Sequence, residues 1–506
     1  RVISTLNYRA DGRGYLEPGY SQIFLLPADG GTPRQITQGE FNHGGKLDWT
    51  PDGNEIIFSA NRNEDWRERA RNSDLWSLNT RTGEMRQLTD RHGPDYAPSL
   101  SPDGSRLAYL GYEDRLMGYH NAQVSILDLN NGQITQVTRG LDRSIDSVDW
   151  AGSSSQLLIS FDDFGQRKIA SVDMEGNLRP LVSDVGSAGI SRPYTSGSLT
   201  VAGNGAYAYT AGGPQRPADV ALGHDDTAIR LTDLNADLLD HKTLGEVREV
   251  SWRSSVGDHD IYGWLVPPPG FDEAQEYPLL LEIHGGPFTA YGPHFSTEVQ
   301  LYAAAGYVVL YTNPRGSTSY GYEFANEIHH NYPGQDYDDL MSGVDAVIDM
   351  GFIDEDQLFV TGGSGGGVLT AWIVGNTDRF AAAAVAKPVI NWISHALYSD
   401  IPEGVTRYWF EQSPWEDFDA YWARSPLSLV GNVTTPTLLL TGEADFRTPI
   451  AETEQYFQAL KLRQVDTAMV RVPEASHGIA SRPSHQIAKV DNIIAWFARY
   501  RIADQE

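Results

Sequence analysis

Residues 360–368 read VTGGSGGGV, with Ser364 as the one serine among five glycines. A glycine-rich run can cradle a phosphate, link two flexible segments, or form a turn too tight for side chains. A phosphate cradle needs a lysine after the glycines, and none follows. A linker is disfavoured because residues 358–361 predict a strand and residues 368–374 predict a helix. The run therefore predicts a tight strand-to-helix turn.

This turn satisfies the G-x-S-x-G pattern of a nucleophile elbow over residues 362–366, where small neighbours let a strained serine project from a sheet edge. Such a serine needs a base and an orienting acid, which follow in the order Ser, Asp, His. Asp445 comes after a predicted strand at residues 437–441, and His477 after another at residues 468–473. Because parallel strands deliver their carboxyl ends to one edge, the sequence predicts a triad of Ser364, Asp445 and His477.

An oxyanion needs backbone donors near the nucleophile. The predicted strand at residues 279–283 runs into a His-Gly-Gly-Pro loop at residues 284–287, whose bare backbone can aim N–H groups at developing charge. Gly365 offers a second N–H, aided by the positive end of the following helix. His284 itself is predicted to be structural, while His485 and the pair His329-His330 are predicted to be solvated.

Residues 244–506 predict an α/β domain. A hairpin over residues 250–270 is followed by apolar strands at 279–283, 307–311, 358–360 and 437–440. Helical stretches, such as 337–350 and 451–462, lie between them. This alternation is typical of a doubly wound, mainly parallel sheet with helices on both faces.

Residues 1–243 are repetitive. The segment LDWTPDGNEIIF (47–58) is echoed by PSLSPDGSRLAY (98–109) and more loosely at 148–160 and 199–209, and RQIT, RQLT, TQVT and IRLT end at Thr37, Thr89, Thr138 and Thr232. A spacing of about 50 residues, Pro-Asp-Gly turns and a period of two predict the blades of a β-propeller rather than a helical solenoid. About four to five blades are countable where propellers have roughly 4–8. The ring is either small or, as we expect, incomplete, with blades preceding Arg1 missing from this chain.

The composition of the chain limits the classes of partner that the protein is expected to bind. A chain of 506 residues predicts more than one domain, and a formal net charge of −29 argues against nucleic acid or an anionic membrane as a partner. The absence of cysteine excludes disulfides, thiolate metal sites and a cysteine nucleophile. We expect no cofactor, no metal and no membrane partner, with homo-oligomerisation left open. We expect a cytoplasmic protein, or a periplasmic or secreted one if a signal segment precedes residue 1.

With these motifs in order, the chain resembles the prolyl oligopeptidase family of serine peptidases, particularly its acylaminoacyl-peptidase branch. The resemblance implies a propeller before an α/β-hydrolase, the triad named above, an oxyanion hole from Gly286 and Gly365, and Arg447 as a ligand of a substrate carbonyl or carboxylate. It also implies a propeller lid that admits only short peptides. The motifs that carry it are HGGP (284–287), NPRGS (313–317), the Ser364 elbow, TDRF (377–380), SPL (425–427), DFRTP (445–449) and His477 followed by Arg482-Pro483.

Two features depart from that family pattern. The residue after the nucleophile is commonly Tyr or another bulky residue, whereas Gly365 stands here. We expect a missing pocket wall, so that Gly365→Tyr preserves the triad and changes selectivity. The short propeller is expected to weaken the selection of substrates by size.

The sequence thus predicts a serine peptidase that releases N-acylated amino acids from peptide N-termini. Blocked termini are preferred because paired glutamates usually hold a free amine and no Glu-Glu pair occurs in residues 1–243. The cluster Arg62, Arg67, Arg69 and Arg71 could bind a carboxylate, although a solvated loop is the favoured interpretation. The alternatives are a dipeptidyl-peptidase or carboxypeptidase-type exopeptidase, an esterase with the same triad, or a propeller binding module with a vestigial site.

Overall fold

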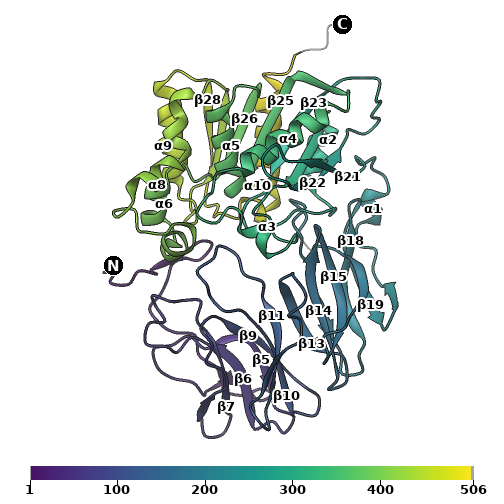
Figure 1. Ribbon diagram of the computed structural model, residues 1–506, viewed down its shortest axis with the longest axis vertical. Coiled ribbons are helices and arrows are strands. Elements are labelled where there is room, and N and C mark those ends of the chain that lie inside the picture. The colour runs from purple at the N-terminus through teal and green to yellow at the C-terminus, as the bar shows by residue number, and fades with distance from the viewer. Residues whose placement is uncertain (1, 188, 503–506) are drawn as a thin grey trace.

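The chain folds into two bodies, one of antiparallel strands and one of helices around a mainly parallel sheet (Figure 1). This computed structural model describes residues 2–187 and 189–502. In Figure 1 the strands of the first half lie below the helix-covered sheet of the second, and the N-terminal end lies between them. The predicted order, a β-propeller followed by an α/β-hydrolase domain, is confirmed.

The second half is organised around one eight-stranded sheet. In sheet order its strands are β21 (Arg248–Arg253), β22 (Asp260–Val266), β24 (Val308–Asn313), β23 (Tyr277–Ile283), β25 (Ile353–Gly363), β26 (Ala382–Ala386), β27 (Thr437–Gly442) and β28 (Thr467–Val472). Neighbours from β24 to β28 run parallel, whereas β22 pairs antiparallel with both β21 and β24. The carboxyl ends of β23, β25, β27 and β28 therefore share one edge, as the predicted site requires.

Helices cover both faces of this sheet. Alternate residues of β23 enter different cores: Leu281 packs with α4 (Asp336–Ile348), α5 (Gly365–Asn376) and α9 (Ile450–Leu462), while Leu280 packs with α2 (Thr297–Ala304) and α10 (Pro483–Ala498). Because these strands are buried on both faces, their sequences are continuous runs of apolar residues. The other helical segments are α1 (Ala236–Leu239), α3 (Tyr322–Asn326), α6 (Trp392–Tyr398), α7 (Pro402–Gly404), η1 (Val405–Trp409), α8 (Phe418–Ala423), η2 (Pro426–Asn432) and η3 (Ile479–Ser481).

Besides a short hairpin within residues 9–15, the described part of the first half contains four four-stranded units and a two-stranded one, in line with the predicted blades. The last two units are joined into one sheet by the single pair Val185 and Ala211. The two-stranded unit is β3 (Phe24–Leu25) and β4 (Arg34–Gln35). The four-stranded units are β5 (Gly44–Trp49), β6 (Glu55–Ala60), β7 (Asp74–Asn79) and β8 (Met85–Gln87); β9 (Asp95–Leu100), β10 (Arg106–Gly111), β11 (Gln123–Asp128) and β12 (Ile134–Gln136); β13 (Ile145–Trp150), β14 (Gln156–Asp163), β15 (Gln166–Asp173) and β16 (Leu178–Val185); and β17 (Leu199–Val201), β18 (Tyr207–Gly213), β19 (Arg216–His224) and β20 (Thr227–Arg230).

One hydrogen bond recurs from blade to blade and accounts for the repeated threonine. In each copy the threonine hydroxyl oxygen accepts the backbone N–H of a residue on the neighbouring strand or segment, where the strand ladder leaves that donor free. The four pairs are Thr37 with Ile23 at 2.8 Å, Thr89 with Leu75 at 3.0 Å, Thr138 with Val124 at 2.9 Å and Thr232 with Val220 at 2.9 Å.

Two stretches of the propeller half are built into the hydrolase body. The segment 190–195 is hydrogen-bonded to α2 and to the loop after β23, through Ile190 O to Thr297 N at 2.7 Å and Thr195 N to Ala290 O at 3.0 Å. A hairpin of β1 (Arg9–Ala10) and β2 (Gly14–Tyr15) contacts the loops that carry Asp445 and His477. The predicted boundary between residues 243 and 244 falls between β20 and β21, and these two stretches cross it.

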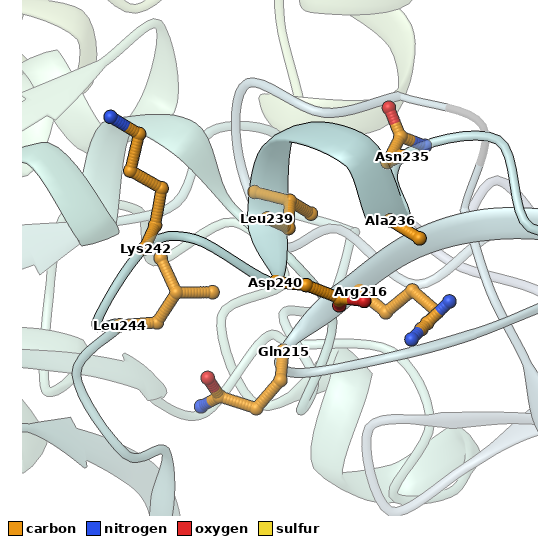
Figure 2. A pocket seen from close by; sticks show the side chains of 8 residues that line it. All are labelled: Gln215, Arg216, Asn235, Ala236, Leu239, Asp240, Lys242 and Leu244. Carbon is orange, nitrogen blue, oxygen red and sulfur yellow. The ribbon is translucent and has the colours of Figure 1, made fainter.

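Beside that boundary, α1 and the start of β19 line an open pocket of about 210 Å³. Figure 2 shows its eight lining residues, with Arg216 and Asp240 near the centre of the view. No predicted site residue lines it. Within residues 2–187 and 189–502, no helix is both long enough and apolar enough to cross a membrane.

Candidate active site

Ser364 lies between β25 and α5 with φ +59° and ψ −122°, a backbone conformation that costs energy for any residue with a side chain. Its glycine neighbours are required by close packing. A Cβ on Gly366 would lie 2.1 Å from Ile283 O, and one on Gly362 would lie 2.4 Å from Gly366 O. This is the geometry of a nucleophile elbow, which presents the serine hydroxyl at the carboxyl edge of the sheet.

Asp445 and His477 meet at the same edge, in the loops after β27 and β28. His477 Nδ1 donates to Asp445 Oδ2 at 2.8 Å. The other carboxylate oxygen of Asp445 accepts the backbone N–H groups of Arg447 at 2.9 Å and Thr448 at 2.8 Å. With Nδ1 carrying the proton, Nε2 of His477 is free to act as a base.

Ser364 Oγ makes no hydrogen bond to His477 within the part of the chain that the structure describes. Catalytic hydrogen bonds are commonly long in ligand-free enzymes and shorten when substrate binds.

The surroundings of His477 keep it neutral. Burial lowers the pKa of its imidazole, and the nearby Lys387 ammonium lowers it further, against the opposing charges of Asp445 and Asp11. Burial, together with the charges of Arg192 and Lys489, lowers the pKa of Lys387 to about 7. Lys387 Nζ donates to the carbonyl oxygen of His477 at 2.6 Å. A neutral imidazole at neutral pH is the form that can take a proton from Ser364.

The two predicted oxyanion donors lie side by side. Gly286 has φ +117°, and a Cβ added to Gly365 would lie 3.1 Å from the nitrogen of Gly286. The loop is held from the propeller half, since Gly285 N donates to Tyr194 Oη at 2.8 Å. His284 is buried, its Nε2 lies 2.9 Å from Ser317 Oγ, and burial lowers its pKa to about 4, all consistent with the predicted structural role.

The expected gap beside Gly365 is filled. Tyr332 Oη donates to the carbonyl oxygen of Gly365 at 2.7 Å, and a Cβ on Gly365 would lie 2.9 Å from that hydroxyl. The expectation of a missing wall that a tyrosine at position 365 would restore is therefore wrong, because Tyr332 reaches the same place from another loop. Tyr332 is distant from Gly365 along the chain, so the contact between them could not be predicted from the sequence.

Arg447 is paired within the protein. Its Nε lies 2.7 Å and its Nη2 3.3 Å from the two carboxylate oxygens of Asp400, and 41% of its side chain is exposed. A substrate group would share this arginine with Asp400. Its role as a substrate ligand stays a prediction.

Among the other predicted positions, His329 and Arg71 each contact a residue of the opposite body. His329 and His330 are half-buried, and each has a partner within the protein: His329 Nδ1 accepts the N–H of Gly118 at 3.2 Å, and His330 Nδ1 lies 3.2 Å from the exposed Glu411. The arginines of the predicted cluster also have partners within the protein, and Arg69 forms an ion pair with Asp65 at 2.8 Å. The guanidinium of Arg62 lies over the ring of Phe41, that of Arg67 over Trp66 and that of Arg71 over Tyr408.

A narrow aromatic cavity adjoins the oxyanion loop, with room for about one water molecule. Propeller residues reach its wall, because Tyr119 stacks on Phe288 with ring centroids 6.3 Å apart. It is lined by Pro287, Phe288, Ile328, His329, His330, Tyr332, Trp392, Tyr408, Trp409 and Phe410. Among the described residues no cluster of three or more side chains suited to a metal ion was found.

Fold and site together define a class: a propeller-bearing α/β-hydrolase with a serine, an aspartate and a histidine at the carboxyl edge of its sheet. Residues 293–502 match the model of the prolyl oligopeptidase family, and residues 13–114 match that of the dipeptidyl peptidase IV N-terminal region. The chain is 34% identical to the uncharacterized peptidase YuxL of Bacillus subtilis, over 98% of this chain and 77% of that protein. The chain belongs to the prolyl oligopeptidase family of serine peptidases.

Other similarities are more distant. Dipeptidyl-peptidase 5 of Porphyromonas gingivalis is 26% identical over 89% of this chain, which spans 66% of that protein, just under two thirds. The acylaminoacyl peptidase of Pyrococcus horikoshii superposes with a TM-score of 0.85 at 21% identity, over 100% of this chain and 78% of that one. The latter likeness concerns the fold.

Proposed function

We propose that the protein hydrolyses short peptides through an acyl-enzyme formed on Ser364. The observation that carries this proposal is the strained Ser364 at the same sheet edge as the hydrogen-bonded Asp445 and His477. His477 Nε2 takes the hydroxyl proton as Ser364 Oγ attacks the carbonyl, then gives it to the departing amine. A water activated in the same way releases the acyl group.

The developing oxyanion is held by the N–H groups of Gly286 and Gly365. Gly286 lies in the loop after β23 and Gly365 at the start of α5, next to each other, so both donors are in place before charge develops. Removing one such donor typically costs about 3–4 kcal/mol of transition-state stabilisation. Asp445 keeps the imidazole in the required tautomer and stabilises it when it is charged.

We infer that the preferred substrates have blocked amino ends and release an N-acylated amino acid. A free amine needs carboxylates to pair with, and the two aspartates beside the triad are already engaged. Asp400 is paired with Arg447, and Asp11 accepts backbone N–H groups. The narrow aromatic cavity beside the oxyanion loop favours a small apolar side chain at the acyl residue.

The second candidate is removal of dipeptides from a free amino end. It is favoured by the relatives named dipeptidyl-peptidase 5. In either case the contact of propeller loops with the aromatic cavity supports a preference for short peptides.

Labelling with a fluorophosphonate probe tests the nucleophile. The intact protein is expected to take up one equivalent, and Ser364→Ala none. Ser196→Ala, at the residue that follows the segment 190–195, serves as the matched control and is expected to label fully. Uptake by Ser364→Ala would overturn the proposal.

Substrate preference is tested with one peptide in three forms: N-acetylated, free, and N-acetylated with an amidated carboxyl end. Fastest cleavage of the acetylated forms is expected. Faster cleavage of the free peptide would favour the dipeptidyl-peptidase, and hydrolysis of simple esters alone would favour an esterase.

A further inference from the structure

A carboxylate from the propeller half holds the backbone of both catalytic loops. Asp11 lies at the tip of the β1–β2 hairpin, and its Oδ1 accepts the N–H of Phe446 at 3.0 Å and the N–H of His477 at 3.0 Å. Oδ2 lies 3.1 Å from the same His477 nitrogen. One carboxylate thus joins the residue that follows the catalytic acid to the catalytic base.

The hairpin is seated so that Asp11 stays in place. Arg9 is buried, with its guanidinium 4.5 Å from the ring centre of Tyr398 and 4.9 Å from that of Phe446, and it donates to Tyr398 O. The N–H of Asp11 donates to Asp400 Oδ2 at 2.8 Å. Asp400 in turn pairs with Arg447, so the hairpin is continuous with the loop that follows Asp445.

The peptide units on either side of His477 are held by opposite charges. Its N–H faces Asp11, while its C=O accepts from Lys387 Nζ at 2.6 Å. A histidine in a loop would otherwise sample several positions, and a displacement of about 1 Å costs up to about 10²-fold in rate.

We propose that Asp11 is a positioning residue, which fixes the loops of Asp445 and His477 relative to Ser364. It acts through backbone groups and touches no reacting atom. The inference rests on the proposed triad. It assigns to the propeller half a direct part in building the catalytic centre.

The effect of charge can be separated from that of hydrogen bonding. The groups whose charge acts on His477 are Asp445, Lys387 and Asp11, while His395, buried nearby, has a pKa lowered to about 3 and stays neutral. Asp11 raises the pKa of His477. Asp11→Asn keeps Oδ1 as an acceptor but removes the charge, so the acid limb of the pH profile should move to lower pH. Asp11→Ala removes both.

The experiment measures kcat, KM and the pH dependence of fluorophosphonate labelling for Asp11→Asn and Asp11→Ala. Asp29→Asn, an exposed aspartate of the propeller half, is the matched control. For Asp11→Ala we expect kcat to fall about 10- to 100-fold with KM changed far less. For Asp11→Asn we expect a smaller loss and the acid-side shift, and for Asp29→Asn neither.

Unfolding curves of the three variants show whether lost activity follows lost structure. Folded Asp11→Ala with kcat like the control, or Asp11→Asn with an unshifted profile, overturns the inference while leaving the proposed function intact. Labelling that persists in Ser364→Ala overturns the proposed function, and the inference with it.

Discussion

At the scale of single residues, the site depends on side chains that are absent as much as on those present. Gly362, Gly365 and Gly366 each lie where an added Cβ would press on neighbouring atoms. At Gly365 the nearest of these atoms are the hydroxyl oxygen of the buried Tyr332 and the nitrogen of Gly286, which is the proposed oxyanion donor.

Gly365→Ala is therefore expected to lower kcat about 10-fold or more, because the new methyl group displaces an oxyanion donor. Tyr332→Phe removes the hydroxyl that lies 2.9 Å from the new Cβ. The double variant should recover much of the lost kcat, since removing the hydroxyl leaves room for the new methyl group. Equal kcat in the single and double variants would contradict this coupling, which a double-mutant cycle on peptide hydrolysis measures.

Ser364, Asp445 and His477 could be predicted from sequence because each follows a recognisable strand, and parallel strands end at one edge. Asp11, Lys387 and Tyr332 could not. Asp11 is separated from His477 by 466 positions, and only the docking of the hairpin brings the two together. Lys387 follows β26 with no motif around it that differs from an ordinary strand end.

At the scale of elements, the strands of the sheet were predictable because burial on both faces leaves continuous apolar runs. The ends of the strands were harder to predict, because β25 begins at Ile353, well before the predicted start at residue 358. The repeated threonine marked the blades correctly, but its hydrogen bond is visible only in the fold.

Thr138→Val is expected to destabilise the propeller by about 1–3 kcal/mol, because the N–H of Val124 loses its acceptor inside a buried blade. Thr138→Ser keeps the hydroxyl and is expected to cost far less. Thermal unfolding of both variants provides the measurement. Equal destabilisation by the two substitutions would show that the methyl group, which Thr138→Val keeps and Thr138→Ser loses, matters as much as the hydrogen bond.

At the scale of the whole molecule, stability should vary with pH through buried carboxyl groups. Burial raises the pKa of Glu452 to about 7, although its Oε2 accepts the N–H groups of Ile390 and Asn391, each at 2.9 Å. A carboxyl group whose pKa is higher in the folded chain than in the unfolded one binds protons preferentially in the folded state. Its contribution is complete at low pH and is lost as pH rises from about 4.5 to about 7.

Glu452→Gln keeps an acceptor for both N–H groups but cannot ionise. Its stability relative to the original protein is expected to rise between pH 4.5 and pH 7.5, by on the order of 1–3 kcal/mol. Melting curves across this range measure the change. The exposed Glu355→Gln is the control, and parallel pH profiles for Glu452→Gln and the original protein would contradict the expectation.

The two bodies were predictable from the change of sequence pattern near residue 244, but their interpenetration was not. Arg192 belongs to the first half by sequence, yet its guanidinium lies 3.1 Å from Glu282 of β23 and 3.3 Å from Glu298 of α2, all three buried. Removing one partner of such a group leaves an uncompensated buried charge, which typically costs about 3–5 kcal/mol.

A fragment cut at residue 244 would consequently carry the proposed nucleophile, acid and base but lose Arg192. Glu298 would keep its ion pair with Lys489, whereas buried Glu282 would lose its ion-pair partner. The catalytic half is thus not an interchangeable module that can be transplanted onto another propeller. Any recombination of halves between relatives would have to transfer residues 190–195 together with the catalytic half. A crossover point chosen from the sequence pattern alone would yield a chimaera with an unpaired charge in its core.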